Sequence, residues 1–274
     1  MKTVLITGGN SGIGKATAQA LVAQGFRVFI AARDMQKSEQ ALAEISAAVP
    51  GAQIAALKLD LSDFDQIRAF AADFRQRVPV LDVLLLNAGL FPTSKQFTAQ
   101  GFEMQFGVNH LGHFLLTQLL LDTVKAAPQG RIVVVSSIMH WLGRINFGSF
   151  RGEKFYNPVV AYGQSKLANL LFAQELSRRL EGSGIAVNAL HPGGVDTGIA
   201  RDLPKFAQKI YGALTVSVEK GAQTSIFLAS APEAAALSGE FVMNSKAAWH
   251  SPVARPAVAR KLWEVSEELV AAKY

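Results

Sequence analysis

Short runs of β-branched and aliphatic residues alternate with longer segments of helical periodicity along most of this 274-residue chain. Such alternation is typical of parallel strands joined by crossover helices. Most of the runs are apolar on both faces, so the strands are expected to lie inside a sheet that helices cover on each side. Seven strands are predicted, at Thr3–Thr7, Arg27–Ala32, Gln53–Leu59, Val83–Asn87, Arg131–Ser136, Ala186–His191 and Glu240–Met243.

The helices predicted between these strands span Gly12–Gln24, Met35–Val49, Phe64–Val78, Phe102–Ala126, Val159–Glu181 and Lys220–Ala229. A last helix is predicted where Val258, Leu262, Val265 and Leu269 share one apolar face, which favours core packing. The stretch Leu142–Pro158 has no clear period, and we expect it to form a loop over the functional site. Because no repeat or linker divides the sequence, we predict one domain, residues 1–274. Its expected fold is α/β, a doubly wound parallel sheet of the Rossmann type with about seven strands and helices on both faces.

Composition limits the chemistry that this fold can carry. Half of the residues are hydrophobic and 18% are charged, which is enough to bury a full core. The sequence contains no cysteine, and this excludes disulfides, thiolate metal sites and thiol nucleophiles. The formal net charge is +6, but the basic residues form no run of five or more. We therefore expect a mildly basic protein that attracts anionic cofactors, with no nucleic-acid partner.

No segment of the sequence predicts export or membrane insertion. Residues from Lys2 run directly into the first strand, without the apolar stretch and cleavage site of a signal peptide. The longest interval without a formal charge, Met104–Leu121, contains an asparagine, two histidines and two glutamines and is a poor membrane span. We expect a cytoplasmic protein without a membrane anchor.

A glycine-rich turn, Thr7–Gly14, joins the first strand to the first helix. Glycines here leave room for a tight turn, for a pyrophosphate close to the backbone and for close helix packing. The amides at the helix N-terminus can then bind phosphates. A glycine cluster alone is weak evidence, and its position after the first strand is what favours a dinucleotide site. The residues expected there are Gly8, Asn10, Ser11, Gly12, Ile13 and Gly14.

The end of the second strand should distinguish NAD from NADP. An acidic side chain there would accept the ribose hydroxyl of NAD and repel a 2′-phosphate, but Ala32 occupies this position and Arg33 follows it. A guanidinium can bind that phosphate through two parallel hydrogen bonds, with Lys37 adding charge. NADP is therefore favoured. NAD stays the minority alternative, because Arg33 could be a surface arginine paired with Asp34, and Asp34 could itself serve the ribose of NAD.

Two further segments end predicted strands at the same edge of the sheet. Asp60 and Leu61 follow the third strand, where a carboxylate can accept from the exocyclic amine of adenine. A helix N-cap is the alternative role for Asp60, although Ser62 and Asp63 suit it at least as well. The small residues Asn87–Gly89 close the fourth strand, and a flat ribose or adenine could pass along their backbone. An ordinary turn is the alternative there.

Tyr162 and Lys166 stand one turn apart in a predicted helix. A phenol with a reference pKa of roughly 10 is a poor acid–base catalyst at neutral pH, but a neighbouring ammonium favours its phenolate. In isolation such a pair is usually a solvated pair on a helix surface. Combined with a dinucleotide site, it predicts a nicotinamide-dependent oxidoreductase.

Taken in order, these motifs resemble the short-chain dehydrogenase/reductase superfamily over nearly the whole chain. The set comprises Thr7–Gly14, Asn87-Ala88-Gly89, Asn109, Ser137, Tyr162-x-x-x-Lys166 and Pro192-Gly193. Each motif is modest alone, and their occurrence together in order is highly specific. A narrower likeness to the retinol dehydrogenase-like branch lies in Ala31–Asp34, Leu59–Asp63, Val108–Phe114, Ser165–Asn169 and the tail from Trp249 to Ser266.

That branch implies NADP-dependent interconversion of apolar aldehydes or ketones with alcohols. Animal members often carry an N-terminal membrane anchor, whereas this chain starts at its first strand, so a retinoid is not the expected substrate. Related protochlorophyllide reductases use cysteines that have no counterpart here. Members of the superfamily often pair through long helices, which implies a homodimer or homotetramer.

The resemblance also implies a role for each residue at the reacting end. Tyr162 would donate a proton to the carbonyl oxygen in reduction and remove it in oxidation. Lys166 would favour its phenolate and bind the nicotinamide ribose. Ser137 would hydrogen-bond the substrate carbonyl; the family motif selects it over Ser136, and capping the next segment is the alternative for both. Asn109 would bend its helix and hold a water that links Lys166 to solvent.

After the sixth strand, the resemblance places the backbone from Gly193 to Val195 and the Thr197 side chain beside the nicotinamide carboxamide. A plain Pro192-Gly193 turn is the alternative. The histidines of the chain form no His-Glu-x-x-His pattern and no cluster with carboxylates, so no metal is predicted.

Substrate specificity is expected in the segments that follow Ser137 and Thr197. The first begins with His140, Trp141 and Leu142, and the second contains Leu203, Phe206, Ile210 and Tyr211 near helical spacing. This composition suits an amphipathic lid over an apolar pocket, and it suits a core helix almost as well. We expect a hydrophobic carbonyl or alcohol substrate.

Two other functions stay open at this point. A non-catalytic NADP-binding redox sensor or scaffold is available to any such fold, but it would not need Ser137, Tyr162 and Lys166 together. Nucleotide-sugar epimerases and dehydratases share the tyrosine–lysine pair, yet they commonly have a different glycine spacing and a larger C-terminal region.

Overall fold

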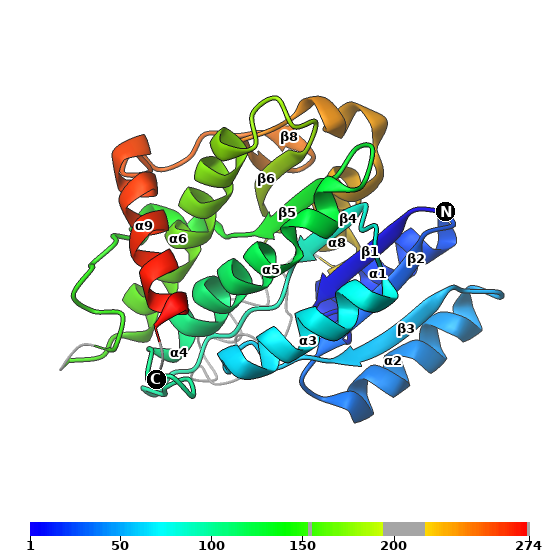
Figure 1. Cartoon of the computed structure of the whole chain (residues 1–274), viewed down its shortest axis with the longest axis horizontal. Coiled ribbons are helices and arrows are strands. Elements are labelled where there is room, and N and C mark those ends of the chain that lie inside the picture. The colour runs from blue at the N-terminus through cyan, green and yellow to red at the C-terminus, as the bar shows by residue number, and fades with distance from the viewer. Residues whose placement is uncertain (153–154, 194–216, 273–274) are drawn as a thin grey trace.

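The computed structural model describes residues 1–152, 155–193 and 217–272, and within them eight strands form one sheet (Figure 1). The strand order is β3-β2-β1-β4-β5-β6-β7-β8. The strands are β1 (Thr3–Thr7), β2 (Arg27–Ala32), β3 (Ile54–Lys58), β4 (Val83–Leu86), β5 (Arg131–Val135), β6 (Ala186–His191), β7 (Phe241–Met243) and β8 (Lys246–Ala247). All neighbouring pairs are parallel except β7 and β8. The order reverses between β1 and β4, the position at which such sheets bind ligands.

Helices cover both faces of the sheet. The longer ones are α1 (Gly12–Ala23), α2 (Met35–Ala48), α3 (Phe64–Arg77), α5 (His113–Lys125), α6 (Pro158–Arg179), α8 (Val218–Ser230) and α9 (Pro256–Ala271). Short helical segments are α4 (Met104–Phe106), η1 (Gly107–Gly112), η2 (Ile138–Leu142) and η4 (Pro232–Ala236). In Figure 1, α3, α5, α6 and α9 follow one another across the same face.

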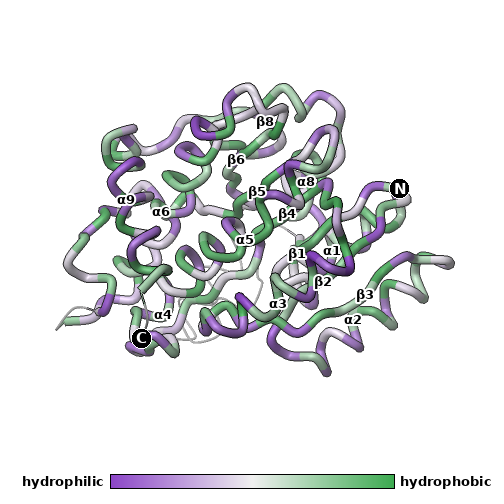
Figure 2. Tube along the Cα trace, in the orientation of Figure 1, coloured by the Kyte–Doolittle hydropathy of each residue, from purple (hydrophilic) through white to green (hydrophobic). Residues whose placement is uncertain are grey.

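Alternate residues of each strand supply two separate cores. In β1, Leu5 belongs to the core under α3, α5, α6 and α9, whereas Val4 and Ile6 belong to the core under α1, α2 and α8. Figure 2 shows hydrophobic residues along the central strands and more hydrophilic ones along the outer turns of α2 and α9. This confirms the doubly wound sheet predicted from strands that are apolar on both faces.

The seven predicted strands are confirmed within two residues at either end, but β8 was missed. It pairs with β7 through a two-residue turn in which Asn244 and Ser245 have φ of 52° and 59°. Two left-handed residues in succession make a tight hairpin turn that usually carries glycine. No glycine marks this turn, so the sequence pattern gave no signal for it.

The predicted helix Phe102–Ala126 starts at Met104 and is not regular. Its middle turn, η1, is a π-helix that contains Asn109. The side-chain amide of Asn109 accepts from Leu90 N (2.9 Å) and donates to Leu90 O (3.1 Å) and Ser165 Oγ (3.1 Å). The helix therefore continues through Asn109 as a wider, π-helical turn. π-Bulges of this kind are frequent at functional sites.

The last predicted helix is confirmed as α9, which packs on α6. The Trp263 ring lies 4.9 Å from the Phe114 ring and 5.9 Å from the Phe172 ring, centroid to centroid. The predicted apolar stripe faces the core, with Leu262 buried. Across the described residues, no helix has both the length and the apolarity needed to cross a bilayer.

Candidate active site

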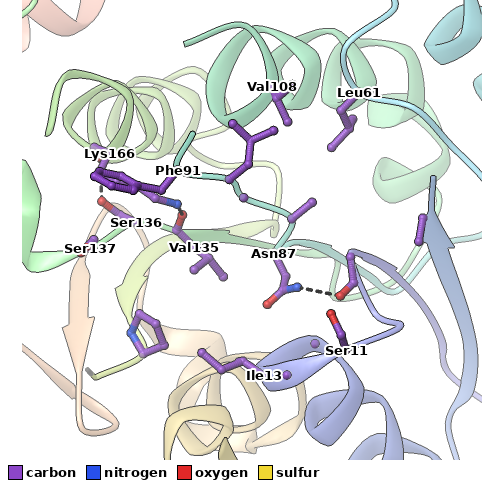
Figure 3. Close-up of a pocket in the computed structure, with 18 of the residues that line it drawn as sticks. Ser11, Ile13, Leu61, Asn87, Phe91, Val108, Val135, Ser136, Ser137 and Lys166 are labelled. Carbon is purple, nitrogen blue, oxygen red and sulfur yellow. Dashed lines mark hydrogen bonds between the residues drawn. The ribbon is translucent and has the colours of Figure 1, made fainter. Parts of the chain in front are cut away.

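A cleft of about 750 Å³ lies at the carboxyl edge of the sheet, beside the ends of the paired strands β1 and β4. Figure 3 shows Ser11, Ile13 and Asn87 at one end of the cleft, and Lys166, Phe91, Ser136 and Ser137 at the other. The predicted residues that line it are Gly8, Asn10, Ser11, Gly12, Ile13, Gly14, Arg33, Asp60, Leu61, Asn87, Ala88, Gly89, Ser137, Tyr162, Lys166, Pro192 and Gly193. Segments far apart in the sequence therefore meet in one cavity.

The glycine turn packs against the residues that follow β4 and is hydrogen-bonded to them. Asn87 donates its side-chain amide to the carbonyl oxygen of Thr7 (2.9 Å) and to that of Gly8 (3.3 Å). A Cβ on Gly14 would lie 2.4 Å from Gly8 O and 2.5 Å from the Asn87 amide, and Gly8 has φ of 66°. Only glycine fits both conditions. The N-cap residue of α1, Ser11, makes no side-chain capping bond, which leaves the first amides of the helix available to a phosphate.

Beside this turn, Arg33 and Lys37 line the cleft where β2 ends. Asp34 is engaged as the N-cap of α2: its carboxylate accepts from Lys37 N (3.0 Å) and lies 3.5 Å from Lys37 Nζ. The backbone hydrogen bond from Lys37 is the main cause that lowers the pKa of Asp34. No ion pair joins Arg33 to Asp34 in the described part of the chain, so the alternative of a mutual surface pair is not what the structure contains.

Asp60 and Leu61 follow β3 and face the same cavity. The Oδ1 of Asp60 accepts from Ser62 N (2.9 Å) and Ser62 Oγ (2.6 Å). The N-cap of α3 is Asp63, which accepts from Asp65 N. Asp60 is therefore held by a local turn at the edge of the cleft and does not cap the helix.

Lys166 is almost fully buried, at 3% exposure. Its Nζ donates to Val135 O (3.1 Å) and lies 5.5 Å from the centroid of the Tyr162 ring. Burial lowers the pKa of Lys166 to about 8, because an ammonium loses hydration in an apolar setting. The Tyr162 ring also meets the ring of Phe91 edge to face, with centroids 5.2 Å apart.

The two serines after β5 have different surroundings. Ser136 is buried and donates its hydroxyl to Lys166 O at 2.7 Å, which ties the strand to α6. Ser137 accepts a 3.3 Å hydrogen bond from Met139 N at the start of η2, and its hydroxyl proton goes to no described residue. Ser137 therefore combines a weak capping role with a donor that stays available in the cleft.

Asn109 does not line the cleft but lies directly behind it. Its Oδ1 would be 3.6 Å from a Cβ on Gly89, and the Lys166 Nζ would be 3.4 Å from the same point. The Lys166 amine and the Asn109 amide oxygen therefore both border the space that a side chain at Gly89 would fill. A side chain at this position would crowd both of them.

In the expected substrate segment after Ser137, Ile138 and Met139 line the cleft, but the described residues that follow them up to 157 do not. His140 is buried, donates Nδ1–H to Ser137 O (2.6 Å) and accepts from Ser251 N (3.1 Å). Trp141 and Leu142 are exposed, and no described residue from 142 to 157 lines the cleft. This loop packs instead on α6, where a Cβ on Gly143 would meet Gly163 O at 2.3 Å. Val195, Thr197, Leu203, Phe206, Ile210 and Tyr211 lie outside the described residues.

The apolar wall of the cleft comes from residues that sequence reasoning missed. They are Leu90, Phe91, Val108, Val135, Ile138, Met139 and Val159. His191 also lines the cleft, and burial lowers its pKa to about 4. Proximity in sequence could have identified some of them, because Ile138 and Met139 follow Ser137 and Val159 lies one turn before Tyr162. Within the described ranges, no group of three or more metal-ligating side chains gathers.

Fold and cleft together define a dinucleotide-binding α/β protein. The family model for short chain dehydrogenases matches residues 2–208. The chain belongs to the short-chain dehydrogenase/reductase family, in its retinol dehydrogenase-like branch. Members are oxidoreductases that act on CH–OH or C=O groups, and their fold binds a nicotinamide dinucleotide.

Three known proteins illustrate the likeness. Human retinol dehydrogenase 11 is 46% identical over 272 residues, which cover 98% of this chain and 86% of that protein. A crystal structure of a protein from Mycobacterium paratuberculosis is 37% identical, with a TM-score of 0.81, and the match covers 100% of this chain and 95% of that one. The RhlG/NADP active-site complex of Pseudomonas aeruginosa is 26% identical, with a TM-score of 0.73 over 88% of this chain and 94% of the other.

Proposed function

We propose that this protein is an NADP-dependent oxidoreductase that interconverts an apolar aldehyde or ketone and its alcohol, with Tyr162 as the general acid and base. The observation that carries the proposal is the position of Lys166, whose buried Nζ lies 5.5 Å from the Tyr162 ring centroid in a cleft that continues to the glycine turn. The positive charge of Lys166 in this position favours the phenolate form of Tyr162, so no additional charged side chain is needed to stabilise the phenolate.

The cleft fits a dinucleotide at its glycine end. Gly8 and Gly14 leave a backbone surface where a Cβ would clash, and the first amides of α1 carry the partial positive charge of the helix N-terminus. Asp60, Leu61 and the segment 87–89 would hold the adenosine part. When bound, the nicotinamide supplies or accepts the hydride.

The chain's own residues would control the proton. In reduction, Tyr162 donates its phenolic proton to the substrate oxygen, and Lys166 stabilises the phenolate that remains. Among the described residues nothing accepts the hydroxyl proton of Ser137, so this proton can hydrogen-bond the same oxygen as negative charge develops on it. In oxidation the phenolate removes the alcohol proton, so one tyrosine serves both directions.

Charge at the end of β2 supports NADP over NAD. Arg33 and Lys37 line this part of the cleft, and the Asp34 carboxylate is occupied by the first turn of α2. A 2′-phosphate would meet two cations, whereas a ribose hydroxyl would find no free carboxylate at Asp34. The Pseudomonas aeruginosa neighbour is a complex with NADP, which agrees with this preference.

An apolar substrate is supported by the wall beside Tyr162. Phe91, Ile138, Met139 and Val159 face the cleft there, and Ile138 and Val159 are 50% and 42% exposed. Exposed aliphatic side chains at the mouth of a cleft gain from covering by an apolar ligand. The retinol dehydrogenases to which the chain is similar carry an apolar alcohol in their names.

A screen of NADPH oxidation with aliphatic, aromatic and terpenoid aldehydes tests the proposal. Turnover should be found with apolar aldehydes, and the Tyr162→Phe variant should lose it by at least about 100-fold while still binding NADPH. Tyr156→Phe is the matched control, since this phenol is bonded to Glu103 and lies outside the cleft. Tight NADPH binding without turnover across the panel would instead support a redox sensor or scaffold.

A further inference from the structure

His113, the first residue of α5, is buried between the glycine turn and the π-turn that holds Asn109. Its Nε2 lies 2.9 Å from Thr7 Oγ1, and its Nδ1 lies 3.0 Å from Asn109 O. No predicted function of the cleft uses this residue. Yet its ring connects Thr7, the last residue of β1, to Asn109 in η1.

The hydrogen bonds of Thr7 determine which nitrogen of His113 carries the proton. Thr7 Oγ1 accepts from Asn87 N (2.9 Å) and Ala88 N (3.0 Å). A hydroxyl has two acceptor lone pairs and one proton, so these two amides leave only the proton for the contact with His113. The Thr7 hydroxyl therefore donates to Nε2, which must be unprotonated.

The other side of the ring leads independently to the same tautomer. Asn109 O is a carbonyl and can only accept, so His113 Nδ1 must carry the hydrogen. In a regular α-helix the backbone N–H of residue 113 would bond this carbonyl. Here that N–H bonds His110 O, and the ring of the same residue donates to Asn109 O instead. The side chain thus completes the hydrogen bonding of the π-turn.

We propose that His113, as the neutral Nδ1–H tautomer, is a positioning residue that fixes Asn109 and the Asn87–Ala88 backbone relative to each other on either side of Gly89. The proposal rests on the proposed function, because it assigns Asn109 and these amides to the catalytic cleft. His113 itself touches neither substrate nor cofactor, since it does not line the cleft.

Two features keep the ring neutral and rigid. Burial, opposed by the hydrogen bond to Asn109 and assisted by the charge of Lys166, lowers the pKa of His113 to about 4. Every polar atom of the ring has a partner at hydrogen-bond distance. A fully satisfied buried network of this kind specifies one geometry and is costly to break in part. One side chain therefore holds two groups in place: the backbone amides of Asn87 and Ala88, through Thr7, and the carbonyl oxygen of Asn109.

His110 provides a matched control on the same turn. It is also buried, but its Nε2 contacts Ser266 Oγ (3.0 Å) on α9 and its ring lies among Phe106, Phe114 and Phe172. His110 and His113 are three residues apart and equally buried, and only His113 is connected to the cleft. A general loss of core packing should affect both variants, and a positioning role should affect one.

The tautomer can be measured without turnover. In the full-length protein with labelled histidine, the two-bond ¹⁵N–¹H spectrum at pH 7.5 should assign the proton of His113 to Nδ1, with and without bound NADP. Neutral histidine in water favours Nε2–H, so the expected pattern is distinctive. An Nε2–H pattern for His113 would overturn the proposal, whatever the enzyme assays give.

Kinetics then separate positioning from packing. His113→Phe should lower kcat by about 10- to 100-fold and weaken NADPH binding by several-fold, whereas His110→Phe should change both by less than about 3-fold at a similar loss of thermal stability. If His113→Phe does not fold, His113→Gln is used in its place, because the glutamine restores an acceptor for the Thr7 hydroxyl. This variant should have nearly wild-type affinity for NADPH and a lowered kcat. Equal kinetic losses in the two phenylalanine variants would refute a positioning role. Failure of the proposed function would look different, because wild-type turnover would be absent while the tautomer and the binding difference persisted.

Discussion

Lys166 holds its Nζ 5.5 Å from the centroid of the Tyr162 ring, inside a structure that exposes only 3% of the lysine. Lys166 therefore lies where it can assist Tyr162, but burial at this position disfavours its charged ammonium form. Burial lowers the pKa of Lys166 to about 8, whereas the unfolded chain would titrate near 10.4. The folded protein thus carries an ammonium at neutral pH at a cost in stability, a common compromise at active sites.

Lys166→Met should make the protein more stable and inactive. Because the folded pKa is lower than the unfolded one, the cost is fully present below pH 8, declines between about pH 8 and 10.4, and is absent above. At pH 7 the variant should gain up to about 3 kcal/mol in the free energy of unfolding, and turnover should fall at least 100-fold. Urea denaturation at pH 7 and pH 10 measures the gain, which should shrink at the higher pH.

The control for this prediction is Lys125→Met, at the exposed end of α5, where the side chain is 46% exposed. It should give no pH-dependent gain in stability. In the Lys166 variant, Val135 O still accepts from Asn169 Nδ2 at 3.1 Å, so no buried carbonyl is left unpaired. A loss of stability at pH 7 would show that Lys166 is held by interactions stronger than its desolvation.

Arg33→Ala should change the choice of cofactor. A guanidinium–phosphate contact is charge-assisted and worth about 1.5–3 kcal/mol, so the Kd for NADPH should rise by roughly 10- to 100-fold. The Kd for NADH should change by less than about 3-fold. Fluorescence titration of both nucleotides measures the two constants. Arg27→Ala is the matched control. Arg27 is the first residue of β2 and Arg33 follows the last one, so the control removes the same charge at the opposite end of the strand. Equal losses for both nucleotides would rule out phosphate recognition by Arg33.

The two serines after β5 should respond differently to alanine. Ser137→Ala removes a hydroxyl that faces the cleft, and kcat should fall by about 100-fold with little change in melting temperature. Ser136→Ala removes the donor to Lys166 O, so the free energy of unfolding should fall by about 1 kcal/mol. Its kcat should fall less than that of Ser137→Ala. Paired kinetics and thermal melts on both variants test the assignment, and the reverse pattern would transfer the role to Ser136.

The parts of this molecule that sequence could predict are those set by local pattern. The strands follow from apolar runs such as Arg131–Val135, and the glycine turn from its place after β1. Contacts across long sequence separations leave no such pattern. Ser251 donates to His140 from 111 residues away, which turns an expected substrate residue into a buried structural one. The hairpin at Asn244 was missed because its left-handed turn contains no glycine.

The site shows the same division. Tyr162, Lys166 and Asn109 could be found because each belongs to a short ordered motif. Phe91 could not, since a phenylalanine after a strand-ending turn usually packs in a core, and only the fold brings its ring to Tyr162. The π-turn at Asn109 likewise depends on its amide reaching Leu90 across a loop. The residues proposed for catalysis could thus be predicted from short motifs, whereas the residues that shape the cleft could not.

Buried histidines should make the protein sensitive to mild acid. Burial lowers the pKa of His110 to about 3, and that of His113 and His191 to about 4 each, whereas unfolded histidine titrates near 6.5. The unfolded chain therefore binds more protons below pH 6.5, and stability that is complete above this pH is lost as the pH falls toward 4. Each histidine should contribute a slope of about 1.4 kcal/mol per pH unit. Burial also lowers the pKa of His140. Burial raises the pKa of Glu103, which opposes this trend above about pH 4.5, but one carboxyl acts against four rings.

His110→Phe should isolate one of these contributions without touching the cleft. Its site among Phe106, Phe114 and Phe172 accepts an apolar ring, and the free energy of unfolding should decline less steeply with acid, by about 1.4 kcal/mol per pH unit. Urea denaturation at pH 8.0, 7.5, 6.0 and 5.0, on the wild-type protein and the variant, measures the two slopes. Between pH 7.5 and 8 the curves should run parallel, because histidine is then neutral in both states. Identical slopes at pH 5–6 would mean that His110 reaches solvent, or binds its proton, before the protein unfolds.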